Sequence, residues 1–318
     1  MSRNHVVFGA AGALGGAIVR RLDREGEQVC AVVRDLERAR RLLPPSVDIR
    51  IGDATSAESV RVACRNADVI YHCVNVPEQK WATVMTVATD NILAAVREAK
   101  AWLVYPGSIH GYGPFRNIPA TEDHPLGATT TQGKLRNTIE RKLVDANLMG
   151  DAKVVIPRFP DFYGPNVANR MVVNIFEAAL AGKKAKWPGK LDVPHDMIYV
   201  DDAASACFLL GANEDSFGQV WHVPGPGPLT GQQFMEIAFA KAGTKPKLGT
   251  RGNGLSRIIT SIAGGPRELG ELRYEFKDPL VLDGSKFVGA YPSFEFTPHE
   301  EAIQRTCEWF GQRLTLGR

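Results

Sequence analysis

The chain has few of the features that mark disulfide scaffolds, metal sites or membrane spans. Its five cysteines are scattered, and none forms a CxxC pair. We therefore expect buried thiols in a reducing compartment, without disulfides. HExxH motifs and clusters of histidine with acidic residues are also missing, so we predict no metal. No apolar run reaches the length that crosses a bilayer, so we do not expect a membrane protein.

Charge excess and targeting signals are equally sparse. The 318 residues carry 38 basic and 35 acidic side chains, which gives a net charge of only +3. Nucleic acid is therefore not an expected partner, because proteins that bind it usually carry a strong basic excess. No signal-peptide pattern precedes the first apolar segment, from which we expect a cytoplasmic protein. With 44% hydrophobic residues the chain can bury a sizeable core.

What the chain does have is a glycine-rich turn near its N-terminus. A β-branched run at 5–8 leads directly into residues 9–15, GAAGALG, and a helical apolar pattern follows. Gly9 permits a tight turn, Gly12 leaves the backbone bare for a pyrophosphate, and Gly15 lets the helix pack closely on the strand. The first N–H groups of that helix and its positive dipole end would face the phosphates. The turn predicts a dinucleotide-binding α/β domain.

The end of the second expected strand bears on the choice between NAD and NADP. This strand, at 28–33, is followed by Arg34 and Asp35. An acidic residue at its end hydrogen-bonds the 2′-hydroxyl of NAD, whereas an arginine pairs with the 2′-phosphate of NADP. Because Arg34 follows the apolar run directly, we predict NADP. NAD is the alternative if Asp35 occupies that position.

Further motifs along the chain share a family resemblance. The G-x-x-G-x-x-G spacing at 9–15, the GDAT segment at 52–55 and the S-x-x-x-Y-G segment at 108–113 are examples. Together they resemble the extended and atypical short-chain dehydrogenase/reductase superfamily, which includes NAD-dependent epimerases and dehydratases. The resemblance implies a Rossmann-type, doubly wound parallel sheet with a smaller C-terminal substrate-binding lobe. We expect the dinucleotide-binding domain at 1–165 plus about 195–224, and the lobe at 166–194 plus 225–318.

The resemblance also implies which residues contact the cofactor. Asp53 would hold the adenine, although it could simply cap the helix that starts near Ser56. Asn75, which follows the fourth strand, would lie near the nicotinamide ribose. The predicted cofactor-binding residues are Gly9, Ala11, Gly12, Ala13, Leu14, Gly15, Arg34, Asp53, Ala54, Asn75 and Lys134.

The catalytic motif of the superfamily is incomplete in this chain. Ser108 takes the position of the serine that hydrogen-bonds the reacting substrate oxygen in the family. The family motif Y-x-x-x-K follows some 25 residues later. Here Lys134 takes the lysine position and Thr130 takes the tyrosine position. Lys134 can still hold ribose hydroxyls, but a threonine hydroxyl is too weak an acid to transfer a proton near neutral pH.

Several groups could replace the tyrosine. His110 lies two residues beyond Ser108, and an imidazole titrates near neutral pH. A plain surface-loop histidine is the alternative interpretation. Tyr112 and Tyr163 are nearby in the layout of the family, and a reaction that needs no strong acid is a further alternative. We predict a small-molecule substrate lined by Ser108, His110, Asp161, Phe162 and Tyr163.

Three functions fit these motifs. We favour an NADP(H)-dependent oxidoreductase that acts on a small carbonyl, hydroxyl or enone compound. The alternatives are an epimerase or dehydratase and a non-catalytic NADP(H)-binding sensor or scaffold. Segment 193–196 lacks the arginine that sugar-nucleotide enzymes usually carry, which argues mildly against a nucleotide-sugar substrate. The resemblance implies a homodimer through helices near 81–100 and 131–147. The basic segment 245–270 is expected to be a mobile lobe bordering the site.

Overall fold

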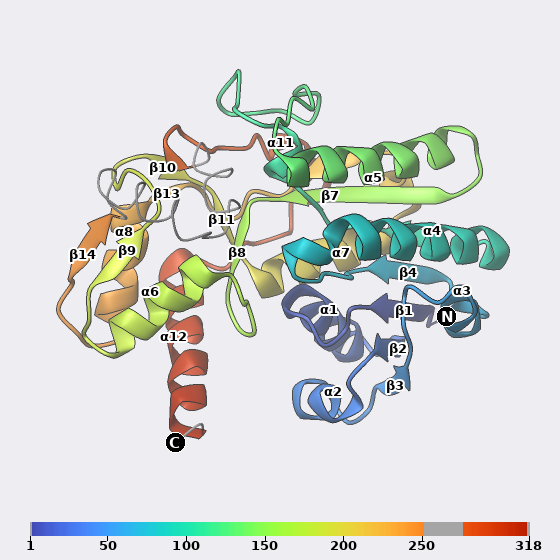
Figure 1. Cartoon of the computed structure of the whole chain (residues 1–318), viewed down its shortest axis with the longest axis horizontal. Helices are drawn as coiled ribbons and strands as arrows, with labels where there is room; N and C mark the ends of the chain where they lie inside the picture. The colour runs from blue at the N-terminus through green and yellow to red at the C-terminus, as the bar shows by residue number, and fades with distance from the viewer. Residues whose placement is uncertain (1, 251–275, 317–318) are drawn as a thin grey trace.

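A parallel sheet forms the centre of the computed structural model, which describes residues 2–250 and 276–316 (Figure 1). The strand order is β12-β7-β5-β4-β1-β2-β3, and β6 pairs with β7. This is the Rossmann-type α/β fold that the sequence predicts. The strands of the sheet are β1 (Asn4–Phe8), β2 (Gln28–Val33), β3 (Asp48–Ile51), β4 (Val69–His72), β5 (Trp102–Val104), β6 (Gly107–Ser108), β7 (Lys153–Phe159) and β12 (Val220–His222).

Helices cover both faces of the sheet because its strands are apolar on both sides. In β1, Val7 packs into the core under α1 and α7, whereas Val6 and Phe8 pack into the core under α3, α4 and α5. This alternation follows from the two-residue period of a strand. The covering helices are α1 (Ala13–Arg24), α2 (Leu36–Leu42), α3 (Ala57–Cys64), α4 (Trp81–Ala99), α5 (Thr131–Leu148) and α7 (Val200–Ala212).

A smaller lobe lies beside the carboxyl ends of the strands (Figure 1). Its helices are α6 (Arg170–Leu180), α8 (Gly231–Lys241) and α12 (His299–Leu316). Helix α11 (Ser285–Ala290) instead packs at the edge of the central sheet, where Lys286 donates to the carbonyl oxygen of Val220 in β12. Its strand pairs are β8 (Asp161–Tyr163) with β11 (Met197–Tyr199), β9 (Ala185–Trp187) with β14 (Leu248–Thr250), and β10 (Pro194–His195) with β13 (Leu229–Thr230). Three short 3₁₀ helices are η1 (Glu78–Lys80), η2 (Ile109–Gly111) and η3 (Glu214–Ser216). Most of the expected mobile segment at 245–270 lies outside the described residues.

Within the described ranges, no helix is both long and apolar enough to cross a membrane.

A buried ion pair joins α5 to β7. Arg158 donates from Nε and Nη2 to Oε2 of Glu140, at 2.9 and 2.6 Å. The two side chains are 5% and 3% exposed. Gly107 of the neighbouring β6 makes room for the pair, because a Cβ there would lie 2.7 Å from Oε1 of Glu140. The pair therefore fixes α5 against the strands that lead to Ser108.

Removing one partner of this pair should destabilise the protein strongly. Glu140→Ala leaves the Arg158 charge buried without compensation, and such changes cost about 3–5 kcal/mol. Urea unfolding at pH 7 measures the free energy of unfolding. Asp151→Ala, which breaks the exposed pair with Arg97, is the matched control and should cost about 0–1 kcal/mol. A loss below about 1 kcal/mol in Glu140→Ala would show that the pair does not hold α5 in place.

Candidate active site

The glycine turn brings the N-terminus of α1 against the carboxyl end of β1. Gly9 has a φ of +74°, and a Cβ there would lie 2.2 Å from the carbonyl oxygen of Cys73. A Cβ at Gly15 would lie 2.4 Å from the carbonyl oxygen of Gly9. Gly12 is the N-cap of α1, and no side chain caps this helix end. The first-turn N–H groups are therefore open to an anion, and the turn fits a pyrophosphate.

The two charged residues after β2 have different surroundings. Asp35 is the N-cap of α2, and its Oδ1 accepts a hydrogen bond from the backbone N–H of Arg38 at 2.9 Å. Arg34 is exposed, and within residues 2–250 and 276–316 no hydrogen bond or ion pair holds its guanidinium. The carboxylate is thus engaged in the helix cap, whereas the guanidinium is available to a ligand at the end of β2.

Asp53 lies at the carboxyl end of β3, close enough to Arg34 for their charges to interact. Its Oδ1 accepts hydrogen bonds from the backbone N–H and Oγ1 of Thr55, both at 2.8 Å. These bonds, and then the charge of Arg34, lower the pKa of Asp53. The cap of α3 is Ser56 and not Asp53, because the Ser56 side chain accepts the backbone N–H of Ser59. The alternative of a plain helix cap for Asp53 is therefore wrong.

One hydrogen bond is made in each of the loops that follow β3 and β4. Asn91 of α4 donates to the carbonyl oxygen of Ala54 at 2.9 Å, which fixes the loop after β3. Asn75 is exposed directly beyond β4, where its Oδ1 accepts the backbone N–H of Val76 at 3.0 Å. The loops after β3 and β4 are thereby ordered on either side of the glycine turn, since β1 lies between β4 and β2 in the sheet.

Ser108 and His110 stand on a segment that α5 holds tightly. A Cβ at Gly133 of α5 would lie 2.4 Å from the carbonyl oxygen of His110. Asn137 donates to the carbonyl oxygen of Gly111 at 3.0 Å. The Oγ of Ser108 is buried and has no hydrogen-bond partner in the described part of the chain. An unsatisfied buried hydroxyl costs about 1–3 kcal/mol, so this oxygen is suited to bind a ligand atom.

Asp161 lies near His110 at the carboxyl end of β7. Ser108 is paired with Phe159 in the parallel ladder, and His110 and Asp161 each lie two residues further on. Oδ2 of Asp161 is 3.2 Å from Nε2 of His195, a residue that sequence reasoning did not select. The signal for it was the His195–Asp196 dipeptide just before β11, where the family usually has a basic residue. Phe162, the next residue of β8, is partly buried and packs on Phe159.

The two tyrosines near the site are engaged in the core. The hydroxyl of Tyr112 accepts a hydrogen bond from Nη1 of Arg158 at 2.6 Å and also contacts His222. Burial raises the pKa of Tyr112 to about 12. Tyr163 is fully buried, and its hydroxyl bonds Nδ1 of His299 at 2.8 Å. Burial also raises the pKa of Tyr163. Neither hydroxyl is available as an acid near neutral pH, and Tyr163 offers no surface to a substrate.

The start of α5 carries both Thr130 and Lys134, and Thr130 is engaged in the helix cap. Thr130 is the N-cap of α5, and its Oγ1 accepts the backbone N–H of Gly133 at 3.0 Å. Lys134 is exposed on the same helix. Three consecutive threonines, at 129–131, stand where this helix begins, and only the structure decides which one caps it.

Arg136, two residues beyond Lys134, lies at the site edge and was not predicted. Its Nη1 donates to the hydroxyl of Tyr105 directly after β5, at 3.2 Å. Its guanidinium lies 4.6 Å from the ring centroid of Trp81. Trp81 in turn donates to the carbonyl oxygen of Val76, in the loop that carries Asn75. The Nε of Arg136 is buried without a partner among the described residues. A cation is thus held at the carboxyl ends of β4 and β5.

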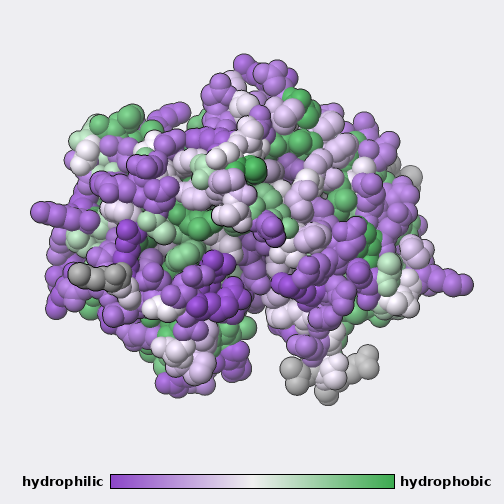
Figure 2. All heavy atoms as spheres, turned by 180° about the vertical axis from the view of Figure 1, so that it is seen from behind, coloured by the Kyte–Doolittle hydropathy of each residue, from purple (hydrophilic) through white to green (hydrophobic). Residues whose placement is uncertain are grey.

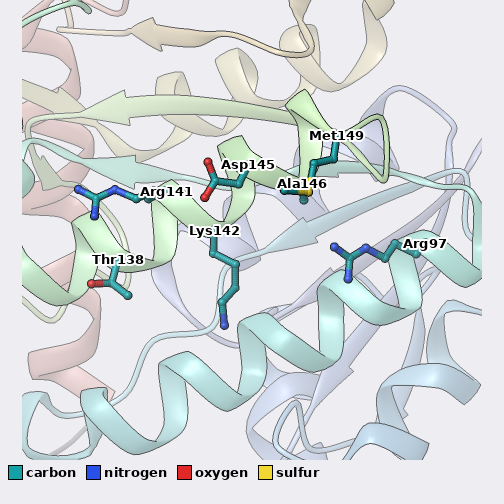
Figure 3. Close-up of a pocket in the computed structure, with 7 residues that line it drawn as sticks. All are labelled: Arg97, Thr138, Arg141, Lys142, Asp145, Ala146 and Met149. Carbon is teal, nitrogen blue, oxygen red and sulfur yellow. The ribbon is translucent and has the colours of Figure 1, made fainter.

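The molecular surface has a notch and a shallow groove. Seen from behind, a notch separates the two halves of the molecule at its lower edge (Figure 2). A shallow groove of about 370 Å³ lies between α4 and α5 (Figure 3). It contains no predicted site residue, so we do not assign it to the substrate. Its lining residues are Arg97, Thr138, Arg141, Lys142, Asp145, Ala146 and Met149. The described residues contain no group of three or more histidine, cysteine or acidic side chains suited to a metal.

Comparison with known proteins identifies relatives of similar sequence and of the same fold. The uncharacterized protein y4nL of Sinorhizobium fredii is 26% identical over 254 residues, which cover 73% of this chain and 70% of that protein. The epimerase Mth375 of Methanothermobacter thermautotrophicus superposes with a TM-score of 0.84 at 17% identity, over 99% of this chain and 94% of that one. The dTDP-glucose 4,6-dehydratase of Bacillus anthracis, solved in complex with NAD, superposes with a TM-score of 0.81 at 16% identity, over 98% and 97%.

The match to a family model extends through the sheet and the site. The NAD dependent epimerase/dehydratase family model matches residues 5–223, from the first strand to the end of β12. This range includes the glycine turn, Ser108 and the Asp161–His195 pair. The chain therefore belongs to the NAD-dependent epimerase/dehydratase family.

Proposed function

We propose that this protein is an NADP(H)-dependent oxidoreductase that acts on a small carbonyl, hydroxyl or enone compound. The observation that carries the proposal is the combination of an open helix N-terminus at Gly12 with a buried, unpartnered hydroxyl at Ser108. Both lie at the carboxyl edge of one parallel sheet, which is where such sheets bind their ligands. Bound cofactor supplies or accepts a hydride, and the chain's own residues position the substrate oxygen and its proton.

The end of β2 supports NADP over NAD. The N-terminus of α1 would hold the pyrophosphate, and the free guanidinium of Arg34 would pair with a 2′-phosphate. Asp35 already accepts a backbone N–H in its capping role, so it is less suited to bind a ribose hydroxyl. The related dehydratase of Bacillus anthracis was solved with NAD, and NAD therefore remains the alternative that experiment must separate.

Arg34→Ala should discriminate between the two cofactors. Loss of a charge-assisted contact costs about 1.5–3 kcal/mol, so the Kd for NADPH should rise about tenfold to hundredfold. The Kd for NADH should change by less than about threefold, since NADH has no 2′-phosphate for the guanidinium to bind. Fluorescence titration of each cofactor measures both constants, and Arg40→Ala, on the exposed face of α2, is the control. An equal effect on NADPH and NADH would contradict the choice of NADP.

The chemistry would be shared among Ser108, His110 and a cation of α5. Ser108 would donate a hydrogen bond to the reacting oxygen of the substrate. His110 would move the proton, because Tyr112 and Tyr163 are engaged elsewhere and Thr130 caps α5. Lys134 and Arg136 are the two cations of α5 that could hold the nicotinamide ribose. Arg136 is the better placed of the two, since it contacts residues that follow β5 and begin α4.

Substitution of each cation separates their roles. Arg136→Ala should raise the Kd for NADPH about tenfold, the equivalent of one charge-assisted hydrogen bond. Lys134→Ala should raise it less, because Lys134 is exposed. Arg136→Lys keeps the charge but loses the planar contact with Trp81, and we expect an intermediate effect. Arg141→Ala, on the outer face of the same helix, is the control. A larger loss in Lys134→Ala would restore the lysine as the ribose-binding residue.

Family membership favours a second candidate, an epimerase or dehydratase. Such a reaction returns the hydride to the substrate, so the cofactor is not consumed. The test is to incubate the protein with NADPH and a panel of small carbonyls and enones while NADPH absorbance is followed. Loss of NADPH with formation of reduced product supports the oxidoreductase. Conversion of a sugar nucleotide without net loss of cofactor supports the epimerase or dehydratase, and tight binding with no conversion supports the sensor.

A further inference from the structure

Asp161 meets His195 near the segment that carries Ser108 and His110, and Asp196 follows His195 in the chain. The ladder of β8 with β11 pairs Asp161 with Met197, so His195 and Asp196 lie directly before the residue opposite Asp161. The Nε2 of His195 is 3.2 Å from Oδ2 of Asp161. His110 of η2 and Asp161 of β8 each lie two residues beyond the Ser108–Phe159 pair of the parallel ladder, and the charge of His110 contributes to the lowered pKa of Asp161. The topology thus brings residues from four different segments to one point of the site.

The two carboxyl groups of this cluster differ in their charge. The Asp161 side chain is 14% exposed. Burial opposes its ionisation, but the hydrogen bond from His195 and the charges of His195 and His110 keep its pKa below the usual range. Asp196 is almost fully buried, and burial raises its pKa to about 7. Its Oδ2 accepts the backbone N–H of Leu282 at 2.7 Å. Asp161 is therefore the carboxyl group of the cluster that stays ionised at neutral pH.

His195 is a rigid support for that charge. Its side chain is 2% exposed, and its ring stacks on Phe276 with centroids 4.9 Å apart and an interplanar angle of 5°. The edge of Trp187 packs against it at 6.0 Å. Backbone pairing of β10 with Leu229 of β13 holds the residue on the other side. A carboxylate bound to so fixed an imidazole keeps one orientation, which is what a positioning residue requires.

We propose that Asp161, held by His195, is the positioning residue that makes His110 the proton-transfer group of the site. The inference rests on the proposed function and deepens it. In reduction, the carbonyl carbon gains a C–H bond by taking a hydride from bound NADPH, and the C=O π electrons move to the oxygen. That oxygen takes a proton from the imidazolium of His110, and the neutral imidazole regains a proton from solvent. A carboxylate next to an imidazole favours its protonated form, which is the form that donates.

Other charged groups surround this cluster and are common to every variant tested. From α5, Lys134 lies on the outside, and Glu140 forms its buried pair with Arg158 behind β6. His222 lies beyond Tyr112 in the same buried network. Asn169, next to α6, is neutral and lies 3.5 Å from Oδ1 of Asp161. Lys134, Glu140, Arg158 and His222 have no direct contact with Asp161 among the described residues, whereas Asn169 and His195 do, so the Asp161→Asn titration is compared with that of His195→Gln.

The direct test is a histidine titration of the protein without cofactor or substrate. Asp161→Asn keeps the side-chain shape and removes the charge. An opposite charge within a few ångströms favours the charged form by about 1–3 pH units, so the NMR titration midpoint of His110 should fall by about one pH unit or more. Asp192→Asn, exposed three residues before His195, should leave the midpoint unchanged, and Asp161→Glu should largely retain it. An unchanged midpoint in Asp161→Asn overturns the inference.

A second test measures turnover. It distinguishes a failure of the role proposed for Asp161 from a failure of the proposed oxidoreductase function. In Asp161→Asn, kcat for reduction should fall about 10²–10⁴-fold, the usual contribution of acid–base catalysis. The rate is lost as pH rises through the titration of His110, and that loss should move to lower pH in the variant. The Kd for NADPH should stay the same. If the wild type reduces its substrate and Asp161→Asn does so with the same rate and pH profile, the role of Asp161 is contradicted. The proposed function then still stands.

Three other outcomes also bear on the role of Asp161. If the wild type binds no NADPH or reduces nothing, the proposed function fails, and the histidine titration still decides whether Asp161 acts on His110. If Asp161→Asn is unfolded by circular dichroism, Asp161→Ser carries the same titration test, with the same expected fall in the midpoint. His195→Gln should lower kcat less than Asp161→Asn, because it removes the support and leaves the charge. A larger fall in His195→Gln would make the histidine, not the carboxylate, the acting group.

Discussion

The buried ion pair between Glu140 and Arg158 connects the elements that form the site. Arg158 lies in β7, whose next residues lead to Asp161, and Glu140 lies in α5, which packs on η2 and His110. Gly107, between them, has no side chain that would displace the pair. Because both charges are buried, neither partner can move without leaving the other unpaired. The ion pair therefore holds α5 and β7 together, and these two elements carry the contacts of the His110 segment and the chain that leads to Asp161.

The site is regular where it would bind the cofactor and unusual where it would perform chemistry. The glycine turn has the close backbone contacts that a phosphate-binding helix needs, with Gly9 and Gly15 each too crowded for a Cβ. Thr130, which the sequence predicts at the tyrosine position of the family motif, caps α5, and Tyr112 and Tyr163 hold internal hydrogen bonds. The Asp161–His195 pair and His110 lie where we propose that the proton is transferred. The physical requirement is the same, a group that titrates near the working pH, and a different side chain can meet it.

Local sequence predicted the sheet, the glycine turn and the serine. These depend on patterns within ten or so residues, such as a β-branched run followed by Gly9 or a serine after a buried strand. Sequence reasoning did not find His195 or the position of Arg136. The contact between His195 and Asp161 joins residues 34 apart, and the partner of Tyr163 is His299, 136 residues away. The orientation of α5 depends on which of three adjacent threonines caps it, and all three are good caps.

The proposed reaction is the transfer of a hydride from bound NADP(H) to a small molecule. The most direct measurement is to supply NADPH that carries deuterium at the transferable position and to follow the label by mass spectrometry across a panel of carbonyls and enones. Hydride transfer should give a reduced product one mass unit heavier than the product formed with unlabelled NADPH, in an amount equal to the NADP⁺ formed. Deuterium that stays on bound cofactor, or a product formed without net NADP⁺, would contradict it.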